Sequence, residues 1–425
     1  MISLGALILF LVLLAVGAPI AVALGLASIV TILVVDLPLQ VVAQRTVNAI
    51  DSLPLLAVPM FIFAANVFNA VGLTDQIYDF TRLLMGRLRG GLAQVAVMAD
   101  LIFSGVSGAA LADIGGLGSV QIRLMKRQGY TPEFAAGITI AAATIGPIFP
   151  PSIPLVIFAA AAEISTVKLL IAGVLPALVI AAFLMLQVAW MARRYNLPRD
   201  EMTLKPGEAR SIVVKSLPAL LAPVLLIGGM LTGIFGPTEV AAITVLYGLV
   251  LGLAYRRLTW EVLFETARET TRATASILFI VATAGLFAWI LTIEQVPAVI
   301  SEALLGISTN PLVLLFLVNV LLLIVGMFME SIAAILILAP ILMPPLAQVG
   351  VDPIHLGVVV VLNLMIGLLT PPVGMSLYMV SSIAKIPVHQ VLRGTMPFFI
   401  PLLASLMVVT LFPSLSTYLP SLFFK

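Results

Sequence analysis

The chain has 425 residues, of which 62% are hydrophobic and 9% charged, and its mean hydropathy is +1.22. Soluble domains are about half apolar and roughly a quarter charged, so this composition excludes a soluble protein and predicts a polytopic, all-α membrane protein. With no cysteine and two histidines, thiolate metal sites and histidine-based metal clusters are excluded. The bilayer is the expected surrounding, and we expect no nucleic acid partner.

Apolar runs that are interrupted by charged residues, Pro or Gly predict the elements of the first half, residues 1–192. In chain order these are spans 2–16 and 18–35, a polar segment 36–52, a span 53–72, a surface helix 77–88, a hairpin 92–128, a broken helix 133–163 and a span 168–192. The hairpin is predicted because two half-length apolar arms flank a Gly/Ser stretch at 104–108. Such a segment enters the membrane and leaves on the same side.

A polar stretch at 193–215 is the predicted cytoplasmic linker to the second half, residues 216–425. The second half repeats the order, with spans 216–233 and 236–255, an amphipathic segment 258–270, a span 271–293, a hairpin 311–348, a broken helix 355–384 and a last span from Val391. A shift of 221 residues carries Gly105 to Gly326, Gly146 to Gly367, and Pro150-Pro151 to Pro371-Pro372. These matches favour two repeats over the alternative of two apolar bundles with scattered helix breakers.

Five crossings in each half would give the two repeats opposite orientations in the membrane. With the N-terminus outside, Arg45, Lys168 and Lys425 are the only basic residues on the outer side, which satisfies the positive-inside rule. The two hairpins then open from opposite faces. This arrangement is typical of a carrier, whereas a channel would need a continuous polar lining that no segment provides.

Prolines in both broken helices remove N–H donors, so carbonyls four residues earlier lose their helical partners. Irregular backbone at membrane depth persists only where protein buries it or a wet cavity lies beside it. Carriers use such breaks, near the midplane, to bind cations and anionic substrates. We therefore expect two cation sites and a substrate site between them.

The expected site residues are hydroxyls, glycines and carbonyls at the hairpin tips and helix breaks, which offer the hard oxygen ligands that sodium prefers. The first cation site comprises Ser104, Gly105, Ser107, Gly108, Thr144 and Gly146, and the second comprises Gly326, Gly367, Thr370, Val373 and Met375. The alternative for the first set is helix packing through small residues. The expected substrate-binding residues are Ser104, Ser107, Pro151, Ser152, Glu330, Thr370, Pro372 and Gly374. Helix N-termini at Ser152 and Gly374 would favour a carboxylate.

Four carboxylates lie within apolar segments: Asp100, Asp113, Glu239 and Glu330. An unpaired carboxylate is costly in a membrane, so each is a functional candidate. Asp113 could instead cap the second arm of its hairpin, and Glu239 is interpreted as a helix cap. For Asp100, Asp113 and Glu330 a functional and a structural role both stay open.

The motifs resemble the large membrane subunit (the DctM-like, or M, subunit) of the tripartite ATP-independent periplasmic (TRAP) transporters. The matching stretches are 103–108 with Asp113, 145–152, 326–340 and 370–374, and the resemblance extends from Val16 to about Pro397. Glu330 departs from the family pattern, where aspartate is common.

The resemblance implies an elevator-type carrier of the ion transporter superfamily in a bacterial inner membrane. It also implies that at least two sodium ions accompany an organic acid, such as a C4-dicarboxylate or sialic acid, that a periplasmic binding protein delivers. A small four-helix membrane subunit is implied as well; no such block precedes Met1 or occupies 193–215, so a separate chain is expected to supply it.

Two alternatives remain. A stand-alone sodium/dicarboxylate or anion carrier would need no binding protein. An intramembrane enzyme could use Asp100 and Asp113 as a catalytic pair, but these residues flank a glycine tip, and the chain has no HExxH, GxSxG or Walker motif.

Overall fold

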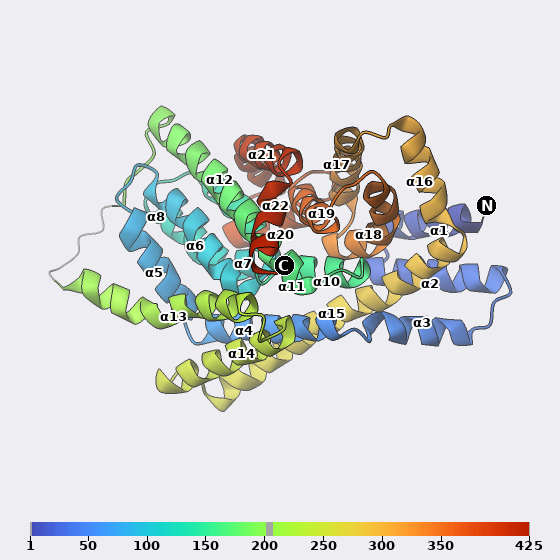
Figure 1. The fold of residues 1–425 in the computed structure, drawn as a ribbon. Coiled ribbons are helices and arrows are strands. Elements are labelled where there is room, and N and C mark those ends of the chain that lie inside the picture. Colours follow the sequence, from blue (N-terminus) through green and yellow to red (C-terminus); the bar gives the residue numbers. More distant parts are fainter. Residues whose placement is uncertain (1, 201–206, 425) are drawn as a thin grey trace.

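The computed structural model describes residues 2–200 and 207–424; residues 201–206 of the predicted linker lie outside this range. Helices account for most of the described chain, and a single antiparallel bridge joins Arg89 to Arg199 without any strand in these ranges. The predicted all-α class is therefore confirmed (Figure 1).

The first half contains α1 (Ile2–Ala15), α2 (Ile20–Val34), α3 (Gln40–Ile50), η1 (Leu53–Leu56), α4 (Ala57–Ala70), α5 (Leu73–Met85), α6 (Gly91–Ser107), α7 (Ala110–Asp113), the π-helical turn η2 (Ile114–Gly118), α8 (Ser119–Arg127), α9 (Pro132–Ala142), η3 (Ala143–Ile145), α10 (Ile153–Ala161), α11 (Thr166–Ala172) and α12 (Val174–Arg194). The second half contains α13 (Glu208–Leu231), α14 (Pro237–Ala254), α15 (Trp260–Ile293), α16 (Val296–Ile307), α17 (Pro311–Phe328), α18 (Ser331–Gln348), α19 (Pro353–Gly367), α20 (Met375–Ala384), α21 (Val388–Leu411) and α22 (Ser414–Phe423). Eight helical stretches of the described chain are long and apolar enough to cross a membrane.

The linker predicted at 193–215 is shorter in the structure, because α13 already begins at Glu208. Two further differences from the predicted elements lie at amphipathic segments. The segments predicted at 258–270 and 271–293 form one helix, α15, of 34 residues. Neither Gly nor Pro interrupts its first 25 residues, and the hydroxyls of Thr266 and Thr270 bond to carbonyls one turn earlier, so the polarity change does not end the helix. The surface helix predicted at 77–88 is α5, which ends at Met85. Arg87 and Arg89 were expected on this helix, but they lie beyond its end.

Two layers build the molecule (Figure 1). In one layer α15 packs along α2, α3 and α4, while α14 packs on α4, and α13 on α5. In the other layer α21 packs on α9 and α12, and α17 packs on α19. Contacts of α15 with α18 and of α13 with α6 join the layers, so each hairpin rests on a helix of the first layer.

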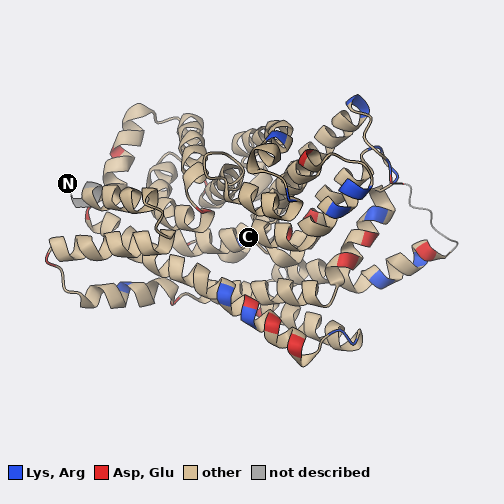
Figure 2. Cartoon of the chain, turned by 180° about the vertical axis from the view of Figure 1, so that it is seen from behind, with Lys and Arg blue, Asp and Glu red and all other residues tan. Residues whose placement is uncertain are grey.

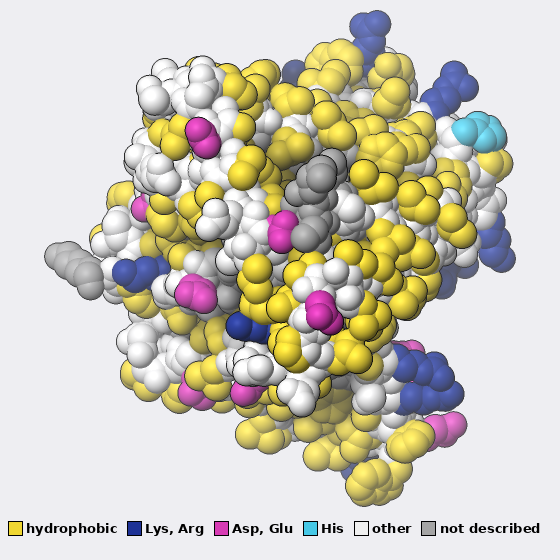
Figure 3. Space-filling view, turned by 90° about the vertical axis from the view of Figure 1, so that its right-hand side faces the viewer, with side chains coloured by type: hydrophobic (Ala, Val, Ile, Leu, Met, Phe, Trp, Pro, Cys, Tyr) yellow, Lys and Arg dark blue, Asp and Glu magenta, His cyan; other side chains and the backbone are white. Residues whose placement is uncertain are grey.

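Large hydrophobic side chains lie exposed on the outer helices of the first layer, among them Leu11, Leu26, Leu225 and Leu246. Hydrophobic side chains also cover much of the face seen from the side of α1 to α3, where most Lys and Arg lie near the margin (Figure 3). Figure 2 shows charged residues gathered at one end, around the starts of α13 and α15. A hydrocarbon-facing belt with one charged end is what a membrane protein requires.

Residues that precede the linker are fixed to that charged end. Arg82 on α5 forms an ion pair with Asp200, and Gln128 donates a hydrogen bond of 2.5 Å to the same carboxylate. The Tyr130 hydroxyl donates to the carbonyl of Pro198 at 2.9 Å. Hydrogen bonding to Asp200 raises the pKa of the Arg82 guanidinium. The chain after α12 is therefore held against both α5 and the end of the first hairpin.

Candidate substrate and cation site

The tip of the first hairpin turns at Gly108. Helix α6 continues through Ser107, so the interruption is shorter than the predicted 104–108, and the chain reverses at Gly108 (φ 65°) and the extended Ala109. Only glycine adopts this left-handed conformation without strain. A side chain at Gly108 would also overlap the carbonyl oxygen of Pro151. The tip therefore needs glycine for its backbone and for its contact with the broken helix.

Asp113 closes this tip from the second arm. Its carboxylate accepts a hydrogen bond from the Ser107 hydroxyl, while its Oδ2 has no hydrogen-bond partner among the described residues. The side chain is 1% exposed. It does not cap the arm, because Ala109 is the N-cap of α7. An unpartnered carboxylate oxygen in a buried site is the strongest indication of a cation ligand in this half.

The first broken helix meets this tip. Helix α9 tightens into η3 and stops, and α10 begins after a turn at 146–152. The Ile153 N–H donates to the carbonyl of Gly108 at 3.1 Å, and a side chain on Gly146 would overlap Oδ2 of Asp113. The structure therefore brings together Ser107, Gly108 and Gly146, as predicted from the sequence, with Asp113.

Other residues predicted for the first site have local partners. The Ser104 hydroxyl donates to the carbonyl of Asp100, and the Thr144 hydroxyl donates to that of Ala141 at 2.7 Å. Ser152, which was predicted for the substrate site, caps α10 by accepting from the N–H of Leu155 at 3.1 Å. A Cβ at Gly105 would lie 2.5 Å from Cβ of Pro223 on α13. Gly105 therefore serves close helix packing, the alternative considered for the small residues.

The second hairpin and the second broken helix repeat the contact between tip and break. A Cβ at Gly367 would lie 2.6 Å from Cα of Gly326, so the two backbones touch. The Val373 N–H donates to the carbonyl of Met327 at 3.3 Å, much as Ile153 does to Gly108. Thr370 donates its hydroxyl to the carbonyl of Ile366 at 3.0 Å.

The two breaks differ in exposure. In the first break, Thr144, Gly146, Pro151 and Ser152 are all buried. In the second break Val373 is 40% exposed and Met375 38% exposed, and Pro372 is exposed as well. Thr370 and Pro371 are partly buried, and Gly374 is buried. The second break is therefore the more accessible one in this conformation.

Each broken helix packs against the hairpin of the other half. Helix α10 packs on α18, and α20 packs on η2 and α8. A Cβ at Gly115 of η2 would lie 3.2 Å from Cε of Met379 on α20. The two broken helices thus interlock with the two hairpins, with the start of α10 buried and the start of α20 more accessible.

The remaining intramembrane carboxylates have structural partners. Gln121 donates a hydrogen bond of 2.8 Å to Asp100, which joins the two arms of the first hairpin. Glu330 caps α18, accepting from Ile332 N at 2.9 Å and Ala333 N at 3.2 Å. Glu239 accepts from the Gly236 N–H, the cap that was predicted for it. Among these four, Asp113 alone has a fully buried side-chain oxygen without a hydrogen-bond partner in the described part of the chain.

One polar cluster beside the second site was not predicted from the sequence. Asn363 donates to Oδ1 of Asn319 at 2.7 Å, and Asn319 donates to the Thr410 hydroxyl at 3.1 Å. These side chains are at most 4% exposed, and Asn363 lies one turn before Gly367. A lone Asn within each of two apolar helices could have indicated the cluster, because buried amides join membrane helices by hydrogen bonds.

A family model described as the DctM component of the tripartite ATP-independent periplasmic transporters matches residues 7–415. The chain belongs to this family. It is 44% identical over 386 residues to the sialic acid TRAP transporter large permease protein SiaM of Vibrio cholerae, covering 90% of this chain and 89% of that one. It is 38% identical over 401 residues to the C4-dicarboxylate TRAP transporter large permease protein DctM of Pseudomonas aeruginosa, covering 94% and 93%. These relatives are transporter permeases and not enzymes.

Among solved structures, the fold resembles the YdaH transporter of Alcanivorax borkumensis. The TM-score is 0.65 at 15% sequence identity, and the match covers 89% of this chain and 88% of that one. This likeness concerns the fold alone.

Proposed function

We propose that this DctM component is the large membrane subunit of a sodium-coupled TRAP transporter that takes up an organic acid. The observation that carries the proposal is the pair of contacts between hairpin tip and helix break, Gly108 with Ile153 and Met327 with Val373. Each contact gathers backbone oxygens and a helix start inside an apolar protein. Carriers bind ions and substrates at such breaks.

The substrate class follows from the helix starts and the relatives. The positive ends of the α10 and α20 helix dipoles favour an anion, and a carboxylate suits them. The first N–H groups of α10 already donate to Gly108 and Ser152, so α10 acts through its dipole. The relatives carry names for sialic acid, C4-dicarboxylate and 2,3-diketo-L-gulonate transport, and all three substrates are organic acids. The proposed substrate site lies between the helix starts at Ser152 and Gly374. Ser107, Thr370 and Pro372 are further candidates for contact with the substrate.

Sodium is the proposed co-transported ion. The unpartnered Oδ2 of Asp113 lies against Gly146 and supplies a hard oxygen ligand for the first ion. Thr370 and the irregular backbone around Gly367 support a second ion. Two sodium ions with a monocarboxylate, or three with a C4-dicarboxylate, carry one net positive charge, and each such charge gains about 2.3 kcal/mol per 100 mV of membrane potential.

An elevator mechanism is proposed because both hairpin tips and both broken helices lie within residues 92–163 and 311–384, called the transport block below. The helices α1–α5 and α13–α15 form the layer beside the transport block, called the wall below. Moving the whole block avoids exposing unpaired carbonyls to lipid, which would cost several kcal/mol for each. We further propose that the halves are inverted repeats and that the N-terminus is periplasmic.

The proposed partners are a small four-helix membrane subunit and a periplasmic substrate-binding protein, as the tripartite family description suggests. The test is uptake of labelled N-acetylneuraminate and succinate by the reconstituted complex, with and without each partner and a sodium gradient. We expect uptake only with sodium and with the binding protein. Uptake without the binding protein would favour a stand-alone carrier, and uptake that ignores sodium would refute the coupling.

A further inference from the structure

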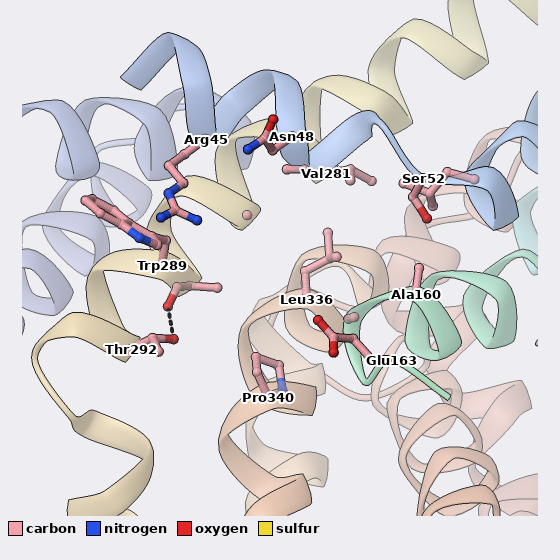
Figure 4. A pocket seen from close by; sticks show the side chains of 15 residues that line it. Arg45, Asn48, Ser52, Ala160, Glu163, Val281, Trp289, Thr292, Leu336 and Pro340 are labelled. Atoms are coloured by element: carbon pink, nitrogen blue, oxygen red, sulfur yellow. Dashed lines mark hydrogen bonds between the residues drawn. The ribbon is translucent and has the colours of Figure 1, made fainter. Parts of the chain in front are cut away.

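A cavity of about 470 Å³ separates the wall from the transport block at one end of the molecule. The wall side of the cavity is formed by α3, the residues just after it, and α15, and the block side by the ends of α10 and the middle of α18. Figure 4 shows Arg45, Asn48 and Trp289 on the wall side, facing Leu336, Pro340 and Glu163. The cavity is thus bounded by the two bodies that the proposed mechanism moves past each other.

Arg45 is the one Lys or Arg that lines this cavity. Its guanidinium carbon lies 4.9 Å from the centroid of the Trp289 ring, an arrangement that orients the side chain through a cation–π contact. Within the described chain Arg45 makes no ion pair. The planar, five-donor guanidinium is therefore held in place with its hydrogen-bonding groups available, the geometry that binds a carboxylate in bidentate fashion.

Hydroxyl and amide groups accompany this cation. Asn48, Ser52 and Thr292 line the same side, and the Thr292 hydroxyl donates to the carbonyl of Ala288 at 2.8 Å. The opposite side carries one carboxylate, Glu163, and otherwise mostly apolar residues. An organic acid in the cavity would be attracted by Arg45 and repelled by Glu163, so its carboxylate would lie against the wall.

Two helices that line the cavity, α10 and α18, begin near the proposed substrate site. Helix α10 begins at the cap Ser152 and reaches the cavity at Ala160, about 12 Å further along at 1.5 Å per residue. Helix α18 begins at the cap Glu330 and reaches the cavity at Leu336 and Pro340. Both helices that start near the proposed site therefore extend to this cavity.

We propose that Arg45, oriented by Trp289, forms a recruiting subsite that binds the carboxylate of the incoming organic acid before it reaches the transport block. The proposal rests on the proposed function and on the periplasmic placement of Arg45. It assigns to the fixed wall a role in substrate recognition, separate from the sites that move. A merely structural Arg45 would anchor α3 at the membrane surface beside Trp289, and lysine would serve that purpose equally well.

Trp289 itself can report binding. The chain has three tryptophans, so Trp190→Phe with Trp260→Phe leaves Trp289 as its only one. The full chain in lipid nanodiscs, in sodium-free choline buffer, is titrated with N-acetylneuraminate and with succinate, and with neutral N-acetylmannosamine as the control. We expect a saturable change in Trp289 fluorescence with at least one carboxylate and none with the neutral sugar.

Substitutions separate the subsite from an anchor. Arg45→Gln should weaken carboxylate binding by about tenfold or more, because charge-assisted hydrogen bonds are lost. Arg45→Lys should weaken it by a smaller factor, and Glu163→Gln should strengthen it by relieving repulsion. If Arg45→Gln bound both carboxylates as the parent does, the subsite would be refuted.

Uptake by the reconstituted complex distinguishes this inference from the proposed function. Arg45→Gln is introduced into the complex that keeps all three tryptophans. It should raise the half-saturating substrate concentration for uptake more than it lowers the maximal rate. If neither substrate is taken up although Trp289 responds, the proposed function fails and the anion subsite stands. If uptake occurs but Arg45→Gln changes neither measurement, this inference alone fails.

Discussion

Gly146 lies directly against Asp113, so that a side chain on the glycine would occupy the place of the carboxylate oxygen Oδ2. That oxygen has no hydrogen-bond partner among the described residues, whereas its neighbour Oδ1 accepts from Ser107. The hairpin tip and the helix break therefore meet at a carboxylate oxygen. An ion bound there would contact both elements and so couple their positions.

Gly146→Ala tests this relationship. The added methyl group must displace the Asp113 carboxylate, and overpacking of this kind costs about 1–3 kcal/mol. We therefore expect the sodium concentration that gives half-maximal uptake to rise by about tenfold or more. Gly228→Ala is the matched control, because no atom lies within 4 Å of the added group. Equal sodium dependence in both variants would contradict an ion site at Asp113.

Thr370→Ala tests the second proposed ion site. Its hydroxyl lies beside the break that starts after Gly367 and donates to the carbonyl of Ile366. Removing this oxygen should raise the half-saturating sodium concentration several-fold while the protein still folds. Thr271→Ala removes a similar helical hydrogen bond from an exposed surface and should leave sodium dependence unchanged. A sodium response in Thr271→Ala equal to that of Thr370→Ala would mean that the effect is not specific to the break.

Helix ends and breaks could be predicted from the sequence where a proline or glycine interrupts the helix. Proline and glycine interrupt helices by geometry, so the breaks at 146–152 and 368–374 could be located without a structure. The span predicted at 236–255, which is α14, and the hairpin predicted at 311–348, whose arms are α17 and α18, were placed to within a few residues. Helix ends that depend on tertiary contacts, such as that of α5 at Gly86, could not be located in this way, because the Gly86 carbonyl accepts from the distant Asp200 N–H.

The site was predicted in outline, but the roles of its members required the structure. A glycine that packs against a wall helix and one that faces a carboxylate have the same sequence signature, so Gly105 and Gly146 could not be told apart. Likewise Asp113 and Glu330 looked equivalent. Only the three-dimensional contacts show that Glu330 has two backbone N–H donors, while Asp113 retains an unpartnered oxygen.

Asn363→Leu tests the buried amide cluster beside the second site. The substitution leaves Oδ1 of Asn319 without its 2.7 Å donor. An unsatisfied buried polar group costs about 1–3 kcal/mol, so the midpoint of thermal unfolding in detergent should fall. Thr410→Val removes only the outer hydrogen bond and should lower the midpoint less. A larger loss from Thr410→Val would show that the stability does not depend on the inner pair.

Asp200→Asn tests the attachment of the segment before the linker. The variant weakens the ion pair with Arg82 and the hydrogen bond from Gln128. Trypsin should then cleave at Arg193, Arg194 or Arg199 several-fold faster, because local opening of this segment costs less. Arg268→Gln breaks an exposed pair with Glu265, which contributes little, and is the control. Unchanged cleavage in Asp200→Asn would mean that the other contacts of Pro198 and Tyr130 suffice.

Two cysteine pairs test whether the transport block moves past the wall, and the natural chain has no cysteine that could interfere. A Cβ at Gly116, in the first hairpin, would lie 3.4 Å from Cγ of Asn69 on α4, so a short crosslinker can join the block to the wall there. A Cβ at Gly25 would lie 3.9 Å from Cβ of Thr283, within disulfide range, and joins two wall helices. Crosslinked Gly116→Cys/Asn69→Cys should lose uptake and regain it on reduction or cleavage of the linker, because the block can no longer leave this position. Crosslinked Gly25→Cys/Thr283→Cys should retain uptake, since the wall stays fixed. If the block-to-wall crosslink formed completely and uptake persisted, motion of the block as a unit would be refuted in favour of local gating at the helix breaks.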